Sequence, residues 1–170
     1  MSEPIDLSFH YTQQDYVRGY RAHAFARTPF FVDVLFAIGV AALGAWCWTL
    51  PDFHLWGAGA MLAGAIFLAL VVAAYWIIPV TVFRREPKFR DDYRMVFSAE
   101  GIHFKTVNID SQLQWTLYTH ALAAKYCYLL YYGKRHLTII PLRVFQSSKE
   151  QERFDAMIRQ HIPRIETKNR

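Results

Sequence analysis

Histidine and cysteine, the side chains most often used for metal binding and nucleophilic chemistry, are scattered along this chain. No two of the seven histidines stand at the spacing of an HExxH or HxH motif. A metal site assembled from distant residues stays open, but ordinary surface histidines are the simpler interpretation. Cys47 lies in an apolar run and Cys127 in a predicted strand, with no CxxC pattern, so we expect two free thiols. The histidines are His10, His23, His54, His103, His120, His136 and His161.

The motifs that position a nucleophile or a phosphate are also missing. The sequence contains no GxSxG, Walker-type or Rossmann fingerprint. The adjacent pair Asp91 and Asp92 is typical of a solvated connector rather than of an acid/base couple. We therefore predict no catalytic residue, no cofactor and no metal site, which favours a protein that is not an enzyme. Of the 8 glycines, those inside the apolar runs are Gly39, Gly44, Gly57, Gly59 and Gly64, which leaves no glycine-rich phosphate loop.

A run of tyrosines is the one aromatic segment that could form a binding surface. In a strand, Tyr126, Tyr128 and Tyr132 would point to one side, while the residues between them are also apolar or aromatic. Such a strand is either buried on both faces or exposes one aromatic face to a peptide, a lipid or another subunit. The favoured interpretation is a central strand covered by the C-terminal helix and the segment near the membrane.

Basic residues outnumber acidic ones, 19 to 14, which gives a net charge of +5 and an isoelectric point near 9.3. This balance could suggest nucleic acid. However, seven of these cations flank the two apolar runs, where contact with anionic lipid headgroups explains them directly. We therefore expect lipid, and not nucleic acid, as the partner of these residues. The candidate membrane-surface contacts are Arg18, Arg21, Arg27, Arg84, Arg85, Lys88 and Arg90.

Two apolar runs, residues 29–50 and 55–83, dominate the first half of the chain. As a helix the shorter run would span about 33 Å at about 1.5 Å per residue, enough to cross a hydrocarbon core of about 30 Å. A buried helix of a soluble protein is the alternative, but two adjacent runs of this length disfavour it. A signal peptide fits worse, because a long polar segment precedes the first run. The sequence therefore predicts a transmembrane helical hairpin.

The distribution of charge around the two runs predicts their orientation. Both outer flanks carry Arg or Lys, whereas the connecting turn carries neither. By the positive-inside rule, both termini lie in the cytoplasm and only the turn lies outside, so the chain is a multi-pass membrane protein. Trp46, Trp48, Phe53 and Trp56 gather near this turn, where aromatic rings favour the headgroup layer.

Small residues line up within the predicted spans and would allow close helix packing. One set of stripes closes the hairpin, and another could pack against a second copy, although alanine is common in membrane helices. The stripes are Ala37, Ala41 and Gly44 on the first helix, and Gly57, Ala60 and Gly64 or Ala65, Ala69 and Ala73 on the second. Asp33 is the one ionisable residue within a span. It is either a functional intramembrane acid or, as favoured, a carboxylate near the helix start that faces water or Arg27.

The polar remainder predicts a second, β-rich part of the molecule. Residues 5–11 alternate as a half-buried strand, and Thr12 with Asp15 forms the capping box of a helix. After residue 84 the pattern predicts about five antiparallel strands closed by a C-terminal helix. The predicted divisions are residues 1–28, the hairpin 29–83, and a domain 84–170. The fold class is thus membrane α+β, a two-helix hairpin with a cytoplasmic antiparallel β domain.

The N-terminal strand has no neighbour close in sequence. Its apolar face and its backbone groups cannot be satisfied by a lone strand. A hairpin returns the chain to the same side of the membrane, so we expect this strand to join the C-terminal domain, beside residues 93–97 or 137–140.

The order of these elements, with the segments EGIHF, SQLQW, YLLYYGKRHLTIIPLRVF and SSKEQERFDAMI, resembles the YcxB-like family of bacterial membrane proteins. The resemblance covers nearly the whole chain and rests on turn and core residues. It implies the bacterial inner membrane and a soluble part similar to bacterial pleckstrin-homology-like domains. It transfers no catalytic residue. Partner or lipid binding by this domain is the leading expectation, an immunity protein against a membrane-active toxin is the alternative, and a lipid-modifying enzyme is third.

Overall fold

The computed structural model describes residues 3–27, 30–132 and 136–167. It forms two compact units, one of residues 1–20 and 83–170 and one of residues 21–82. We call the first the β unit and the second the hairpin unit. The helix α1 (Gln13–Arg27) begins in the β unit and ends in the hairpin unit.

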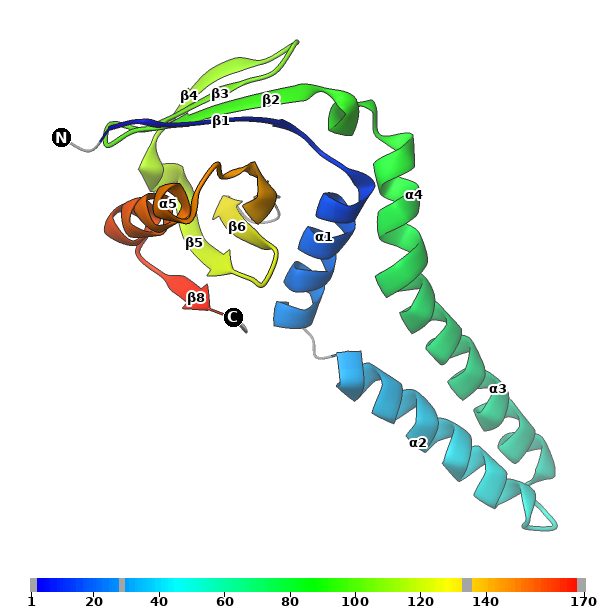
Figure 1. The fold of residues 1–170 in the computed structure, drawn as a ribbon. Coiled ribbons are helices and arrows are strands. Elements are labelled where there is room, and N and C mark those ends of the chain that lie inside the picture. The colour runs from blue at the N-terminus through cyan, green and yellow to red at the C-terminus, as the bar shows by residue number, and fades with distance from the viewer. Residues whose placement is uncertain (1–2, 28–29, 133–135, 168–170) are drawn as a thin grey trace. The chain divides into compact units, whose positions relative to one another are not determined.

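The hairpin unit is built from two long apolar helices. Helix α2 spans Phe30–Trp48 and helix α3 spans His54–Val72; one π-helical turn, Ala73–Ile77, then leads into α4 (Ile78–Arg85) (Figure 1). Both α2 and the continuous helix from His54 to Arg85 are long and apolar enough to cross a membrane by length and composition. The predicted runs are therefore helical, and the second continues as far as Arg85. Residues 28 and 29, where the first run was predicted to begin, lie outside the described residues.

Glycines on one face bring α2 and α3 into backbone contact. A Cβ atom built on Gly57 would lie 2.6 Å from Trp48 N and 2.7 Å from Gly44 O. On Gly64 it would lie 2.9 Å from Ala37 O. No side chain fits in these gaps, so only glycine allows this approach. The predicted closing stripes of small residues are confirmed.

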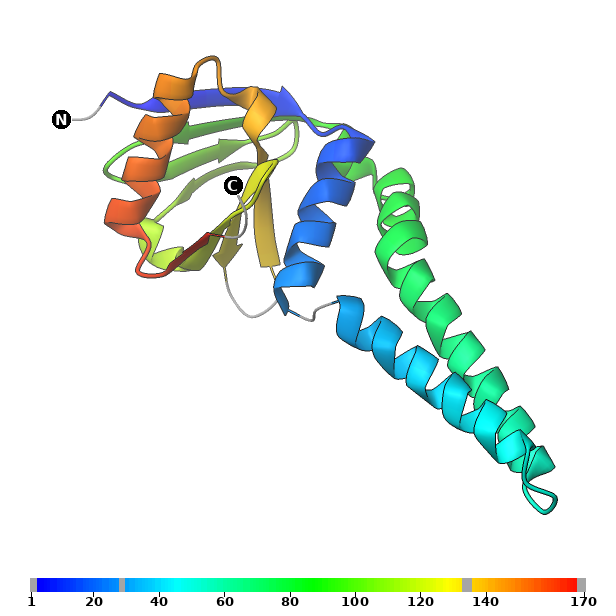
Figure 2. The ribbon, with the colours of Figure 1, turned by 60° about the horizontal axis from the view of Figure 1, so that its bottom comes forward.

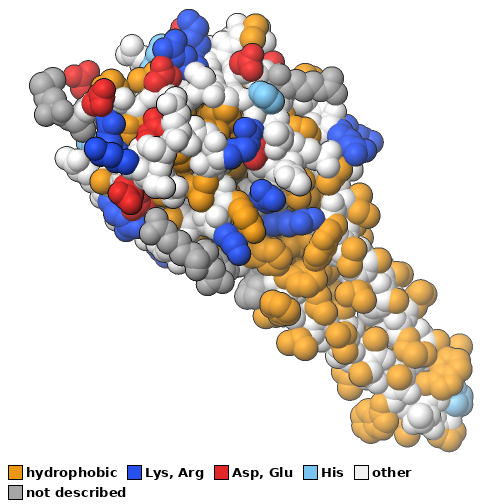
Figure 3. All heavy atoms as spheres, in the orientation of Figure 1, with side chains coloured by type: hydrophobic (Ala, Val, Ile, Leu, Met, Phe, Trp, Pro, Cys, Tyr) orange, Lys and Arg blue, Asp and Glu red, His pale blue; other side chains and the backbone are white. Residues whose placement is uncertain are grey.

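The rest of the hairpin surface is apolar and exposed. Leu55 is 89% exposed, Trp56 77% and Phe31 74%. On the face shown in Figure 3, the surface of α2 and α3 is largely hydrophobic, without Lys, Arg, Asp or Glu. The second small-residue stripe lies on this surface, since Ala65 and Ala69 are exposed.

In the β unit, the first sheet has the order β1–β2–β3–β4 and joins the two ends of the chain. Strand β1 (Ile5–His10) runs antiparallel to β2 (Asp92–Phe97), with Ile5 opposite Phe97 and Phe9 opposite Tyr93. Strands β3 (Ile102–Lys105) and β4 (Asp110–Leu113) complete it. The predicted pairing of the N-terminal strand with residues 93–97 is thus confirmed, and the pairing with 137–140 is not observed.

The second sheet has the order β7–β6–β5–β8. The described residues of the β unit therefore form eight strands, whereas the sequence predicted about six, the N-terminal strand and about five after residue 84. Strands β6 (Cys127–Tyr132) and β7 (His136–Pro141) were predicted, while β5 (Tyr118–Ala123) and β8 (Ile165–Thr167) were not. Adjacent residues Ala121 and Leu122 are both buried, which hides the two-residue period of β5. Strand β8 pairs in parallel with β5, so the expectation of a purely antiparallel domain was wrong. Between the two sheets, Trp115 begins a short 3-10 helix, Trp115–Leu117.

Helix α5 (Ser148–His161) packs beside both sheets and closes the core (Figure 2). Its Phe154 is fully buried, with its ring centroid 4.9 Å from that of Phe97 in the first sheet and 5.2 Å from that of Tyr128 in the second. Ser147 caps the helix by accepting a hydrogen bond from Glu150 N. The remaining connections are two 3-10 turns, Pro87–Arg90 and Leu142–Val144.

The close approach at Gly57 generates a matched test. Gly57→Ala and Gly59→Ala add the same methyl group to one helix, but nothing lies within 4 Å of the new Cβ at position 59. We expect Gly57→Ala to lower the free energy of unfolding of the hairpin by about 1–3 kcal/mol, the usual cost of overpacking, and Gly59→Ala to leave it unchanged. Titration with SDS in mixed micelles, followed by circular dichroism, measures the difference. Equal midpoints for both variants would contradict the backbone contact.

The docking of β1 generates a second test. Phe9 is buried, whereas the adjacent Ser8 is exposed and lies opposite Arg94 in the strand pairing. We expect Phe9→Asp to destabilise the full-length chain by more than about 1 kcal/mol, because it places a charge in a small core. Ser8→Asp should be neutral. Thermal unfolding followed by near-ultraviolet circular dichroism makes the comparison, and a Phe9→Asp variant that melts with the parent would show that β1 is not docked.

Candidate membrane-surface and partner site

A capping box fixes the start of α1, the helix that carries the first predicted basic residues. Thr12 Oγ1 accepts a hydrogen bond from Asp15 N at 3.2 Å, and the Asp15 carboxylate accepts from Thr12 N at 2.9 Å and Thr12 Oγ1 at 2.7 Å. This arrangement was predicted from the sequence. It satisfies backbone donors that would otherwise be unpaired at the helix start.

The same carboxylate binds Arg143, just after β7. Arg143 Nη2 donates to Asp15 Oδ2 at 2.6 Å, and its Nε lies 3.0 Å and 3.1 Å from the two carboxylate oxygens. A further bond runs from Arg143 Nη2 to His10 O at 2.8 Å, at the end of β1. The side chain of Asp15 is only 6% exposed. We call this group of residues the Asp15–Arg143 lock. The sequence did not reveal it, because its partners stand 128 residues apart.

The electrostatics of the lock follow from its hydrogen bonds. Burial alone would raise the pKa of the Asp15 carboxyl, but the hydrogen bonds from Arg143 and Thr12 outweigh burial and hold the pKa below its usual value. Beside it, Tyr11 donates a 2.6 Å hydrogen bond to Ile139 O on β7, and burial raises the pKa of its hydroxyl. Both groups therefore act as structural contacts and not as exchangeable acids near neutral pH.

One turn of α1 further on, the helix meets the turn between β5 and β6. A Cβ on Gly19 would lie 2.7 Å from Ile139 side-chain atoms, so the helix contacts β7 closely. The guanidinium of Arg18 lies 4.5 Å from the ring centroid of Tyr126, and Lys125 Nζ lies 5.6 Å from it. We call Arg18, Lys125 and Tyr126 the Tyr126 site.

Of the three tyrosines predicted to share a face, only Tyr126 lies at the surface. It is 48% exposed, whereas Tyr128 is 2% exposed and packs against Phe154 and Phe145. The Tyr128 hydroxyl is 3.3 Å from Asp155 Oδ1. Tyr132 is half-buried, with its ring centroid 5.8 Å from that of Tyr118. The interpretation as a central covered strand therefore describes Tyr128, and the exposed aromatic surface is reduced to Tyr126.

The other predicted surface cations divide by their contacts. Arg84 and Arg85 are exposed at the end of α4, and Arg84 Nε lies 3.4 Å from Gln13 Oε1. Lys88 is exposed but paired with Glu86 at 3.4 Å. The side chains of Arg27 and Arg90 lie outside the described residues.

Arg21 has a structural contact within the hairpin unit. Pro79 has no N–H and therefore cannot donate a backbone hydrogen bond within this helix. Arg21 Nε donates to Tyr75 O at 3.1 Å, and its guanidinium lies 5.2 Å from the centroid of the Trp76 ring. The π-helical turn at the same place widens the helix, as such turns commonly do at contact sites. Arg21 thus joins α1 to the middle of the second long helix, a contact that the sequence did not indicate.

Most cations elsewhere in the β unit are neutralised by carboxylates. Among residues whose side chains the structure describes, Arg18, Arg21, Arg85, Lys125 and Lys149 have no carboxylate oxygen within 4.0 Å. Four of these five lie in the segments that flank the hairpin or in the Tyr126 site. The charge that is not neutralised is therefore concentrated there. The paired cations are Lys88, Arg94, Lys105, Arg143, Arg153, Arg159 and Arg164.

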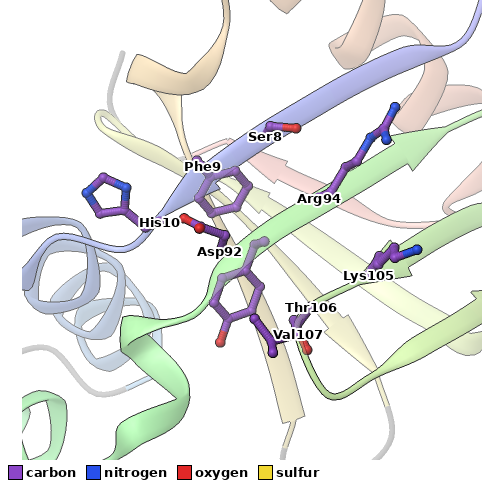
Figure 4. A pocket seen from close by; sticks show the side chains of 9 residues that line it. Ser8, Phe9, His10, Asp92, Arg94, Lys105, Thr106 and Val107 are labelled. Carbon is purple, nitrogen blue, oxygen red and sulfur yellow. The ribbon is translucent and has the colours of Figure 1, made fainter.

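A shallow hollow of about 450 Å³ lies on the first sheet (Figure 4). Its two cations are already paired, Arg94 with Asp6 at 2.6 Å and Lys105 with Asp110 at 3.3 Å. Among the described residues, no group of three His, Cys, Asp or Glu side chains could hold a metal ion. The hollow therefore offers no evident site for a charged ligand. It is lined by Ser8, Phe9, His10, Asp92, Tyr93, Arg94, Lys105, Thr106 and Val107.

The two cysteines and Asp33 lie outside the lock and the Tyr126 site. Cys127 is a buried free thiol whose pKa is raised to about 12 by burial, so it is not a reactive nucleophile. Cys47 is a half-buried free thiol in α2. Asp33 lies half-buried in the first turn of α2, where a carboxylate interacts favourably with the helix dipole.

Comparison with known proteins gives a family match for part of the β unit. The family model described as YcxB-like protein matches residues 97–158, from the end of β2 into α5. The similarity inferred from the sequence segments is therefore confirmed for this region, while β1, α1 and the hairpin lie outside the match. No curated protein and no solved structure matched the chain.

The Asp15–Arg143 lock predicts a pH dependence. Because the folded-state pKa of Asp15 lies below that of an unfolded aspartate, about 3.9, its contribution is present above that pH and is lost as the pH falls through the folded-state pKa. The drop in unfolding free energy between pH 6 and pH 3 should be smaller for Asp15→Asn than for the parent. Arg143→Gln should cost about 1–3 kcal/mol near neutral pH.

Chemical unfolding at each pH measures these free energies of unfolding. It is carried out on the parent, both single variants and the double variant. The double variant should lose less than the sum of the two single losses, since the partners interact directly. Additive losses, or parallel pH profiles for Asp15→Asn and the parent, would contradict the lock.

Proposed function

We propose that this chain, whose residues 97–158 match the YcxB-like family model, is a non-enzymatic integral protein of the bacterial inner membrane. Its hairpin anchors it, and its β unit is a pleckstrin-homology-like domain on the cytoplasmic side. That domain binds an anionic lipid surface or a protein partner.

The observation that carries the anchor is the exposure of the hairpin. A helix that is apolar on all sides needs either a protein core or lipid around it. Here α2 and α3 contact one another through Gly44, Gly57 and Gly64, while large side chains such as Leu55 point outward. Lipid is the environment that makes this exposed surface favourable.

The charges around the hairpin support the proposed orientation. Helix α4 ends with Arg84 and Arg85, and α1 carries Arg18 and Arg21, while residues 49–53 between α2 and α3 contain no Lys or Arg. The positive-inside rule then favours a cytoplasmic position for both termini.

The architecture of the β unit supports the proposed domain type. Four strands form one sheet, three antiparallel strands form most of the second, and a C-terminal helix inserts Phe154 between them. Such a domain needs no catalytic group to act as a binding module, and cations without carboxylate partners offer it an anionic partner.

Two measurements test the proposal. The full-length chain should stay with the membrane after alkaline carbonate extraction, as an integral protein does. Alkaline phosphatase fused after residue 170 or before residue 1 should be inactive, and green fluorescent protein at the same positions should fluoresce. Release by carbonate would overturn the anchor, and an active phosphatase at either end would overturn the orientation.

A further inference from the structure

The turn between β5 and β6 holds an exposed aromatic ring in a fixed place. Ala124 N donates to Cys127 O at 2.9 Å, and Leu142 N donates to Tyr126 O at 2.9 Å. One bond closes the turn around Tyr126 and the other holds its carbonyl, while its side chain remains 48% exposed. A large ring that is held rigidly at the surface is pre-organised to bind a partner.

Two cations converge on this ring without a counter-charge. Arg18 comes from α1 and Lys125 from the turn, 4.5 Å and 5.6 Å from the ring centroid. Neither has a carboxylate oxygen within 4.0 Å among the described residues. The aromatic face attracts both cations, but they repel one another, and an anion between them would relieve that repulsion.

The position of Arg18 along the chain identifies the anion. Arg18 stands on α1 only 12 residues before Phe30, where the apolar helix α2 begins. A membrane that α2 enters is therefore close, along the chain, to the Tyr126 site. Tyrosine favours the headgroup layer, and arginine and lysine bind anionic lipids there.

We propose that the Tyr126 site, Arg18 with Lys125 and Tyr126, docks the β unit onto anionic phospholipid headgroups of the membrane. This inference rests on the proposed membrane anchor. The site adds two features to that anchor: one turn of the domain makes the contact, and a lipid phosphate is its ligand.

The test uses the full-length chain in lipid nanodiscs. Hydrogen–deuterium exchange of the backbone amides of residues 124–127 is compared in discs of pure phosphatidylcholine and in discs with 30% phosphatidylglycerol. We expect at least three-fold slower exchange with phosphatidylglycerol. The double variant Arg18→Gln, Lys125→Gln should lose this difference, and Tyr126→Ala should reduce it.

Lys149→Gln is the matched control, because Lys149 is an exposed cation on α5 that also lacks a carboxylate partner in the described part of the chain. It should keep the parent's response. Poly-glutamate peptide and inorganic phosphate, added to phosphatidylcholine discs, separate the alternatives. Protection by either, without protection by phosphatidylglycerol, would assign the site to an acidic protein or a free anion and overturn the proposal.

If a variant folds poorly, the parent chain is sufficient for the test. Equal exchange of its residues 124–127 in the two lipid mixtures would overturn the docking site. Failure of the anchor is distinct. A chain that does not incorporate into discs and is released by carbonate refutes the proposed function itself, whereas a chain that incorporates but shows no lipid dependence refutes only the Tyr126 site.

Discussion

The pairing of β1 with β2 is the constraint on which the rest of the β unit depends. Six residues at the start of the chain must reach a strand that lies beyond the whole hairpin in sequence, with Ile5 opposite Phe97 and His10 opposite Asp92. Without β1, β2 would be an edge strand with unpaired backbone groups, and the core would lose the buried Ile5 and Leu7. Both ends of the hairpin segment must therefore return to one sheet.

The Asp15–Arg143 lock stabilises this arrangement where the chain leaves β1 and enters α1. It joins the end of β1, the start of α1 and the turn after β7 through one carboxylate and one guanidinium. A buried carboxylate is costly unless it is paired and hydrogen-bonded. Here the capping box and Arg143 supply both conditions, so the desolvation of Asp15 is offset where the chain leaves the sheet for the helix.

The two units pack through different types of residue. The hairpin packs through glycine, because only the absence of a side chain lets Gly57 approach Gly44 so closely. The β unit packs through aromatic rings, with Phe154 between Phe97 and Tyr128. Among the described side chains, most cations of the β unit have a carboxylate partner, whereas Arg18, Arg21 and Arg85 near the hairpin have none within 4.0 Å.

The sequence by itself determined the features that depend on local periodicity and composition. The two apolar helices, the small-residue stripe through Gly57 and Gly64, the Thr12–Asp15 capping box and the N-terminal strand all follow from residues close together in the chain. The similarity of residues 97–158 to the YcxB-like family was also visible there.

Only the tertiary structure decided which residues from distant segments meet. Strand β5 is buried on both faces and β8 is very short, so neither has a clear two-residue period. The lock, the hydrogen bond from Arg21 to Tyr75 O, and the contact of Arg18 with the Tyr126 ring each join residues far apart in sequence. Local patterns carry no information on such contacts, because chain folding alone brings these side chains together.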